Sequence, residues 1–282
     1  MSNCKCKNSP VVWLLILLSV AIVTLPKSAT AGIGRHKGEL YLQWGYNWSA
    51  YSASDLHFQG EGYDFTLHSV TAEDRPTPFD FGTYFAPARM TIPQYDGRLG
   101  YYIGDRTSVS FGVTHLKYIV QQMQGTTISG YIDDSVSDDY GGVYDNTLIQ
   151  LDDDFLMYEH TDGLNYANIE IETMVPVWEN SKPTMGLYAT MALGAGLVTP
   201  VTDVTLFGDQ RSDKLNLAGY GINTKVGLKF EFWTRLYLQY FVSVGWMDLS
   251  GIPTRSGGSD TADQSLIFIE HAGVMGVTLY TF

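Results

Sequence analysis

Charged side chains recur at alternate positions within segments that are apolar on their other side. The set comprises five acidic and four basic residues: Glu39, Asp96, Arg98, Glu170, Glu172, Lys225, Lys229, Glu231 and Arg235. In an extended chain, alternation places these charges on the face opposite the apolar side chains. If that face is enclosed, each charge must pair or stay hydrated, because burying an unpaired charge costs several kcal/mol. The mixed signs predict an ion-pair network, with a narrow polar conduit as the alternative.

A second candidate for chemistry is an acidic stretch. Residues 121–163 hold ten acidic residues and no lysine or arginine. Calcium takes about six to eight oxygen ligands from such groups. No Asp-x-Asp-x-Asp-Gly register occurs, so the pattern favours a solvated surface loop, with an irregular cation site as the alternative. The candidate cation ligands are Asp133, Asp134, Asp138, Asp139, Asp152, Asp153 and Asp154.

A third candidate is a hydrolase site, which needs a serine activated by a histidine that a carboxylate orients. His115 lies near Ser110, and Glu170 lies on a later segment. His115 and Ser110 are an odd number of residues apart, so an extended strand places them on opposite faces. His271 lies beside Glu270 without a serine two residues away. We therefore favour a non-enzymatic role, and we expect no cofactor and no bound metal at these residues.

Residues 1–31 have the features of a cleaved signal peptide. Lys5 and Lys7 precede an apolar run, and an Ala-Thr-Ala cleavage sequence ends at residue 31. Both cysteines, Cys4 and Cys6, belong to this leader, so the mature chain from Gly32 has none. Its 14 basic residues, of 17 in the full sequence, stand against 30 acidic ones, a net charge of −16. This charge disfavours nucleic acid as a partner.

The mature chain, residues 32–282, contains eight segments in which apolar and polar residues alternate with period two, as expected for strands. The segments are 38–48, 93–103, 107–120, 164–178, 184–199, 216–231, 235–248 and 265–282. Short connections at 104–106, 179–183 and 232–234 alternate with long ones at about 49–92, 121–163, 200–215 and 249–264. Alternation of this kind, with an even strand number, predicts that both termini lie on one side of a closed antiparallel sheet.

Two places depart from the simple pattern. Leu56–Leu67 has the pattern of a hairpin inside the first long connection; if it and Phe81–Ile92 also belong to the closed sheet, the strand number is ten. In 107–120 the apolar side changes, from Val109 and Phe111 to Leu116 and Tyr118. A β-bulge near Thr114 is the expected explanation.

The last segment, Ser265–Phe282, is long, rich in β-forming residues and ends on Tyr280-Thr-Phe282. A final aromatic strand behind a secretory leader resembles bacterial outer-membrane β-barrel proteins. The resemblance implies a single up-and-down transmembrane barrel of eight strands, with apolar side chains facing lipid. The charged interior is similar to that of OmpA-like transmembrane barrels, whose lumen is plugged.

The expected function follows from this architecture. We expect an outer-membrane protein, with both termini periplasmic, that presents acidic surface loops for binding or for stabilising the envelope. Its partners would be outer-membrane lipid and lipopolysaccharide, with divalent cations as a further candidate. The alternatives are a lipid A-modifying enzyme and a narrow channel for small solutes. The sequence does not indicate an oligomeric state.

Overall fold

The computed structural model describes Gly34 and residues 36–180, 184–212, 216–233, 235–255 and 259–279. The predicted leader, and with it the predicted cleavage at residue 31, lies outside the described residues, as do Tyr280 and Phe282. Strands dominate the described chain, which also includes one short helix, α2 (Phe81–Tyr84). In this part of the chain no helix has the length and apolar character that crossing a membrane requires.

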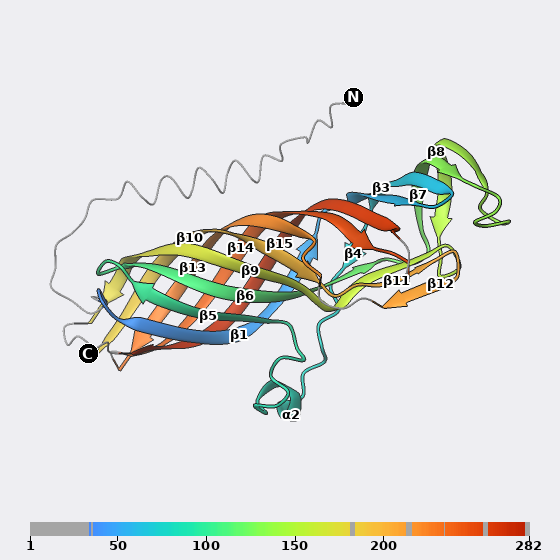
Figure 1. Ribbon diagram of the computed structural model, residues 1–282. Helices are drawn as coiled ribbons and strands as arrows, with labels where there is room; N and C mark the ends of the chain where they lie inside the picture. Colours follow the sequence, from blue (N-terminus) through green and yellow to red (C-terminus); the bar gives the residue numbers. More distant parts are fainter. Residues whose placement is uncertain are drawn as a thin grey trace.

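Eight antiparallel strands form a closed ring (Figure 1). In order around the ring they are β1 (Leu40–Tyr51), β5 (Tyr95–Tyr102), β6 (Thr107–Val120), β9 (Leu156–Glu179), β10 (Met185–Pro200), β13 (Gly219–Phe232), β14 (Leu236–Pro253) and β15 (Thr261–Leu279). The ring closes where β1 pairs with β15, from Leu40 opposite Leu279 to Tyr51 opposite Phe268. The predicted eight-stranded antiparallel barrel is confirmed, and each predicted segment overlaps one ring strand.

The alternative barrel of ten strands is wrong. The predicted hairpin exists as β2 (Ser54–Gly60) and β3 (Tyr63–Val70), but β2 pairs with the end of β15, Thr261–Gln264, beyond the closed ring. Residues 81–84 form helix α2 instead of a strand. Neither segment therefore enters the ring.

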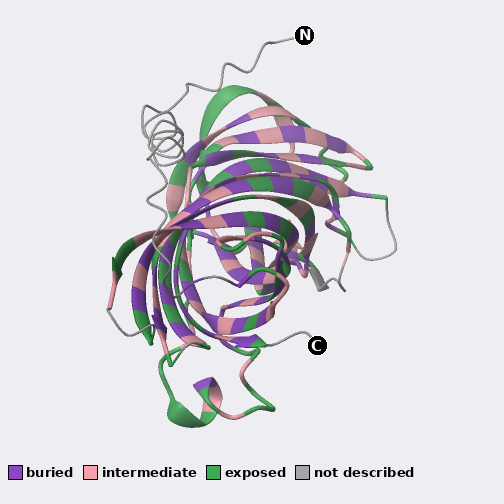
Figure 2. Cartoon of the chain, turned by 90° about the vertical axis from the view of Figure 1, so that its left-hand side faces the viewer, coloured by how far each residue is buried: buried purple, intermediate pink, exposed green. Residues whose placement is uncertain are grey.

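The half of the molecule where Leu40 pairs with Leu279 is called the belt half here. Its outward side chains are mostly apolar and exposed, and its inward ones are mostly polar and buried. The outward set includes Leu42, Leu99, Val109, Phe111, Ile169, Ile171, Leu193, Ile222, Leu228, Leu238, Tyr240, Ile269 and Met275. The inward set includes Gln43, Ser108, Ser110, Asn168, Thr190, Gln239 and Ser243. Figure 2 shows the resulting bands of buried and exposed residues along each strand.

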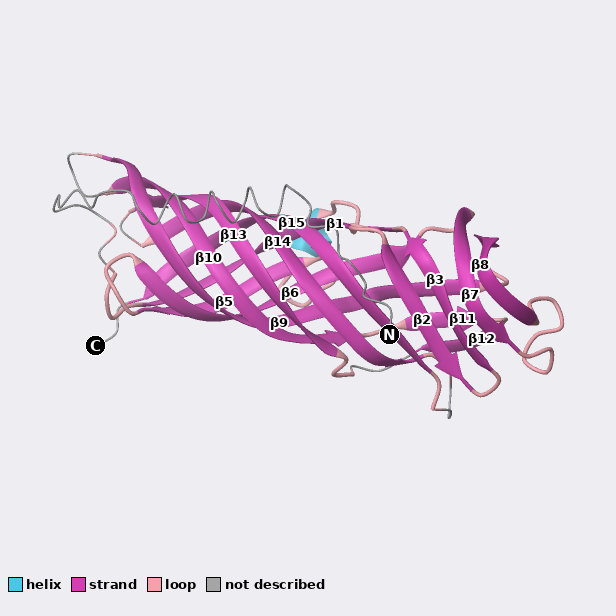
Figure 3. Cartoon of the chain, turned by 90° about the horizontal axis from the view of Figure 1, so that it is seen from above, coloured by secondary structure: helices cyan, strands magenta, loops and turns pink. Residues whose placement is uncertain are grey.

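The other half, called the distal half, continues the wall beyond the ring (Figure 3). It consists of the far ends of β6, β9, β14 and β15 with the added strands β2, β3, β4 (Ala72–Glu73), β7 (Gln124–Ile132), β8 (Gly142–Leu151), β11 (Asp203–Leu206) and β12 (Asp209–Ser212). Here the interior is an apolar cluster that includes Leu56, Phe58, Phe65 and Phe155. The outward side chains of the β2–β3 hairpin are polar, as at His57 and Thr66.

Strand β6 passes through both halves without changing its geometry. Even-numbered residues face inward throughout, and they change from Ser108 and Ser110 to Leu116 and Tyr118. The predicted bulge near Thr114 is therefore wrong, because the environment changes while the pleat continues. A true irregularity lies against β9, where residues 161–163 stand opposite the single residue Lys117. Gly163 permits it by adopting a φ of +132°, which favours glycine.

Candidate functional site in the barrel interior

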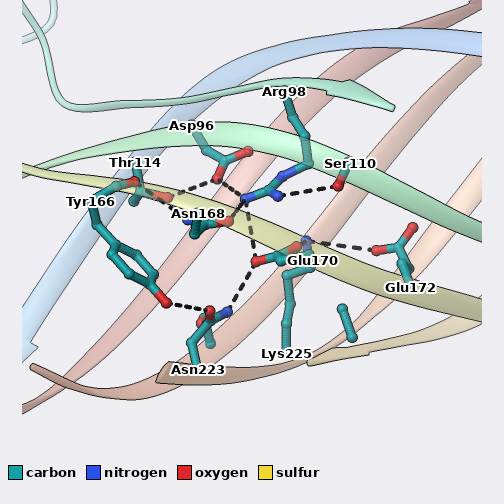
Figure 4. A network of polar contacts seen from close by, with 12 residues as sticks. Asp96, Arg98, Ser110, Thr114, Tyr166, Asn168, Glu170, Glu172, Asn223 and Lys225 are labelled. Atoms are coloured by element: carbon teal, nitrogen blue, oxygen red, sulfur yellow. Dashed lines mark hydrogen bonds and ion pairs between the residues drawn. The ribbon is translucent and has the colours of Figure 1, made fainter. Parts of the chain in front are cut away.

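The centre of the belt half holds a network of paired charges, called the central network (Figure 4). Arg98, inward on β5, lies 3.5 Å from the Asp96 carboxylate and 3.2 Å from the Glu170 carboxylate. Its guanidinium also donates hydrogen bonds to Ser110 Oγ at 3.2 Å and to Asn168 Oδ1 at 3.0 Å. Each of these side chains points inward because alternate residues of β5, β6 and β9 share the inner face.

Glu170 connects two cations from opposite walls of the barrel. Lys225 comes from β13, which lies four strands from β5 in the ring of eight. Its Nζ lies 2.6 Å from Glu170 Oε2 and 3.7 Å from Glu172 Oε2. Asn223 donates a further hydrogen bond to Glu170 at 3.0 Å. Two cations and an amide at one buried carboxylate satisfy charges that would otherwise carry a large desolvation cost.

A separate group, called the proximal cluster, lies nearer the Leu40–Leu279 end of the ring. Lys229 Nζ lies 3.6 Å from Glu231, donates a 2.6 Å hydrogen bond to Tyr102 OH, and lies 3.9 Å from the Tyr237 ring centroid. Glu39 joins this cluster through His36, described next. Except for Arg235, the predicted charges are thus divided between two groups, with tyrosine rings around the lysine of the second.

His36, which the sequence analysis missed, links the acidic members of the proximal cluster. Its Nδ1 lies 2.7 Å from Glu39 and its Nε2 lies 3.1 Å from Glu231. Burial lowers the pKa of His36, but the hydrogen bond and charge of Glu231, together with Glu39, outweigh burial and raise the pKa above 6.5. The histidine precedes the first strand, so period-two alternation gave no signal for it.

Glu270 is a second member of the interior that the sequence analysis did not include. It faces inward on β15, is 3% exposed, and accepts a 2.9 Å hydrogen bond from Asn47. Among the described residues, no basic side chain forms an ion pair with it. The alternation of β15 could have identified it, because the even-numbered residues of this strand, such as Ala262, Leu266 and Phe268, face inward. With Glu270, the interior around Arg98 and Lys225 carries more carboxylates than cations.

Arg235 was predicted to belong to the interior charges, and this prediction is wrong. Strand β14 begins at Leu236, and Arg235 lies exposed in the turn that precedes it. Its backbone carbonyl accepts a 2.8 Å hydrogen bond from the Thr278 amide. By parity Arg235 would face inward, but parity applies only to residues within the strand.

The structure does not assemble the candidate cation ligands of the acidic stretch. Asp133, Asp134, Asp138 and Asp139 lie between β7 and β8, whereas residues 152–154 lie between β8 and β9. Among the described residues, no group of three or more histidine, cysteine, aspartate or glutamate side chains could hold a metal ion. One member, Asp152, accepts a 3.0 Å hydrogen bond from the Phe155 amide and so stabilises a local turn.

The hydrolase residues lie on opposite faces of the wall. Ser110 and Glu170 are buried in the interior, each bound to Arg98. His115 faces outward, where its Nδ1 lies 2.8 Å from Asn165 Oδ1 and its ring stacks on Tyr95. His271 also faces outward, with Nδ1 3.1 Å from Tyr240 OH. Neither histidine reaches a serine and a carboxylate together.

No protein-family model matches the sequence, and no curated protein matches it. Among solved structures, the chain is similar to the outer membrane protein OprG from Pseudomonas aeruginosa, with 9% identity, a TM-score of 0.40, and coverage of 89% of this chain and 100% of that chain. Neisserial surface protein A is similar at 10% identity and a TM-score of 0.34, covering 84% and 96%. Ail, the attachment invasion locus protein of Yersinia pestis, is similar at 10% identity and a TM-score of 0.29, covering 84% and 99%. At these values the likeness does not extend to function, and the ring of eight strands itself establishes the fold.

Proposed function

We propose that this protein spans the bacterial outer membrane as a plugged barrel, with both termini periplasmic, and presents an acidic distal half that binds a basic partner. The observation that carries the proposal is the reversal of sidedness along single strands. In the belt half the apolar side chains face outward, and in the distal half they face inward. A protein wholly in water would not expose an apolar band around an entire barrel, whereas lipid outside the belt half accounts for it.

Side chains cross or fill the described interior of the barrel. In the belt half the central network crosses the lumen between β5 and β13. Beyond this network, in the distal half, apolar side chains such as Leu116, Tyr118 and Phe268 are buried in the interior. An eight-stranded barrel is about filled by its own side chains. This packing supports a plug over the alternative of a narrow channel.

The acidic surface lies at the end of the molecule farthest from the belt. Asp133, Asp134, Asp138 and Asp139 are exposed at the β7–β8 turn, and no lysine or arginine occurs in residues 121–163. Because the carboxylates are dispersed, their combined field suits a basic partner better than it suits a chelated calcium ion. Binding of this kind weakens as salt increases.

Planar-bilayer recordings and a binding assay test the two parts separately. The refolded protein should give no stable conductance steps; reproducible steps would contradict the plug. An oligolysine peptide should bind to the refolded protein in low salt, and the change of all four aspartates at 133, 134, 138 and 139 to asparagine should abolish most of that binding. Changing the same four residues to glutamate, which keeps the charge, is the matched control. Equal binding by the asparagine and glutamate variants would exclude this surface.

A further inference from the structure

Between β4 and β5 the chain leaves the barrel wall sideways. Residues 74–94, called the side lobe, contain helix α2 and return to the wall at Tyr95, where β5 begins. Figure 1 shows α2 standing away from the barrel beside its wall instead of at either end. The central network, the proximal cluster and the acidic surface all lie elsewhere.

The side lobe exposes aromatic rings. Phe79 and Phe81 are each 70% exposed and Phe85 is 60% exposed. Phe81 contacts both other rings, with 4.6 Å between the centroids of Phe81 and Phe85 and 6.2 Å between those of Phe79 and Phe81. They therefore form one apolar surface directed away from the protein core. A contiguous apolar surface of this kind marks an interaction site.

Polar contacts hold the side lobe against the outward face of the barrel. Tyr84 is buried, and its hydroxyl donates a 2.6 Å hydrogen bond to the Thr77 carbonyl. The Tyr46 hydroxyl, from the outward face of β1, donates to the Tyr84 carbonyl. Lys117, from the outward face of β6, donates a 3.1 Å hydrogen bond to Thr77 Oγ1. The lobe is thus anchored to two ring strands.

The anchor lies at the edge of the apolar belt. Beside it, Trp44 stacks on Tyr95 with ring centroids 4.4 Å apart, and Tyr95 stacks on His115 at 5.1 Å. Amphipathic rings such as tryptophan and tyrosine gather where a membrane meets water. Below this level on the same strands, Leu99 and Phe111 face outward. The side lobe is therefore attached to the wall at the boundary of the belt.

The side lobe carries no net charge, because Asp74 and Asp80 balance Arg75 and Arg89. Arg89 is exposed on the lobe, and Lys117 lies against it, in a protein of formal net charge −13. Cationic side chains near a membrane are attracted to anionic headgroups.

We propose that the side lobe rests on the outer leaflet of the surrounding membrane, with Phe79, Phe81 and Phe85 inserted at the boundary between headgroups and acyl chains. Arg89 then lies at the level of the lipid phosphates. The proposal depends on the proposed location of the barrel in a membrane. It assigns the lobe a lateral contact with lipid, which the plug and the acidic surface do not involve.

Depth measurements with nitroxide labels test this contact. Cys4 and Cys6, both in the predicted leader, are the only cysteines of the sequence, so a chain that starts at Gly32 accepts single labels without further changes. Labels at Phe79→Cys, Phe81→Cys and Phe85→Cys are measured in refolded full-length mature protein in mixed phosphatidylcholine and phosphatidylglycerol vesicles. Accessibility to oxygen, which concentrates in lipid, is compared with accessibility to a water-soluble nickel chelate. Leu99→Cys on the belt and Val143→Cys on β8, where the native valine is 88% exposed, are the lipid and water controls.

The proposal predicts that the lobe labels are more accessible to oxygen than to nickel, as at position 99, and unlike position 143. If position 99 reports lipid while all three lobe labels resemble position 143, the lobe proposal is wrong and the membrane barrel stands. If the lobe labels are shielded from both reagents, protein covers the lobe, for example a second copy, and the proposal is also wrong. If position 99 itself reports water, the proposed function fails together with the lobe proposal.

Discussion

The belt half and the distal half have the same strand geometry and opposite chemistry. On β6, Phe111 faces outward and is exposed, whereas Tyr118 faces inward and is fully buried. The pleat does not change between them. The difference shows that the surroundings of a barrel wall, and not its backbone, decide which face carries the apolar side chains. The height at which the pattern reverses then indicates where the apolar environment outside the wall ends.

Removing the central carboxylate should have the largest effect on the belt half. Glu170→Gln leaves Arg98 and Lys225 without their shared counter-charge, and breaking a buried pair costs about 3–5 kcal/mol. We expect the upper part of that range, because two cations lose a partner. Urea unfolding of refolded protein in vesicles measures the change.

Glu270→Gln is the matched control for that change. It removes a buried carboxylate that forms no described ion pair and retains a group that Asn47 can bind. We expect no loss of stability, since removing surplus charge lowers the desolvation cost. An equal loss in both variants would show that the interior does not distinguish paired from unpaired carboxylates.

In the distal half, the corresponding large effect comes from a cavity. Phe65 is 1% exposed within the apolar cluster, and Phe65→Ala should cost about 3–4 kcal/mol, as large core truncations do. The same change at Phe111, which faces outward on the belt, should cost less because it creates no enclosed cavity. Equal losses at both positions would contradict the contrast between the two halves.

A lysine placed on the outward face should destabilise the belt half more than the distal half, because the two halves have different surroundings. Ile171→Lys, on the belt, should cost about 2–3 kcal/mol in vesicles, because the proposed membrane places a lysine there in hydrocarbon. Thr66→Lys, outward on β3 of the distal half, should change the stability very little. The result that would count against lipid around the belt is a neutral effect at both sites.

The smallest expected effect is the pH dependence of the proximal cluster. The pKa of His36 is raised above its ordinary 6.5 by Glu231 and Glu39, against the effect of burial. Its contribution to stability is therefore fully present below pH 6.5 and is lost as the pH rises through the raised value. The melting temperature of the wild type should fall over that window more than that of His36→Gln. If the melting temperatures of the two proteins change with pH in the same way, His36 does not cause the pH dependence.

Period-two alternation was enough to predict the ring. The segment 107–120 has the same bounds as β6, and each of the other seven segments overlaps a ring strand. Alternation is informative there because each strand of the belt half has one polar and one apolar face. It could not reveal that Leu116 and Tyr118 belong to a second apolar environment, since a change of surroundings and a bulge give the same pattern along one strand.

The distal strands and part of the interior site depend on contacts between distant residues. β7 and β8 lie in a stretch that was predicted to be a solvated loop, and their inward residues are buried by strands far away in the sequence, as Ile128 is by Leu67 across from it on β3. To place Arg235 outside the interior, one must know that β14 begins at Leu236, and alternation alone does not define where a strand begins. The side lobe is anchored by Tyr46 and Tyr84, a pairing of residues in different elements that no local pattern indicates.

The seam between β1 and β15 joins the first and the last strand of the ring over all twelve residues of β1. No nascent chain that lacks β15 can complete this seam, and until then two strand edges remain open to mispairing. Closure of the wall must therefore wait until β15 has been synthesised, and pairings of such long sequence separation form slowly. Biogenesis then depends on keeping an unfinished sheet unaggregated until its two ends meet.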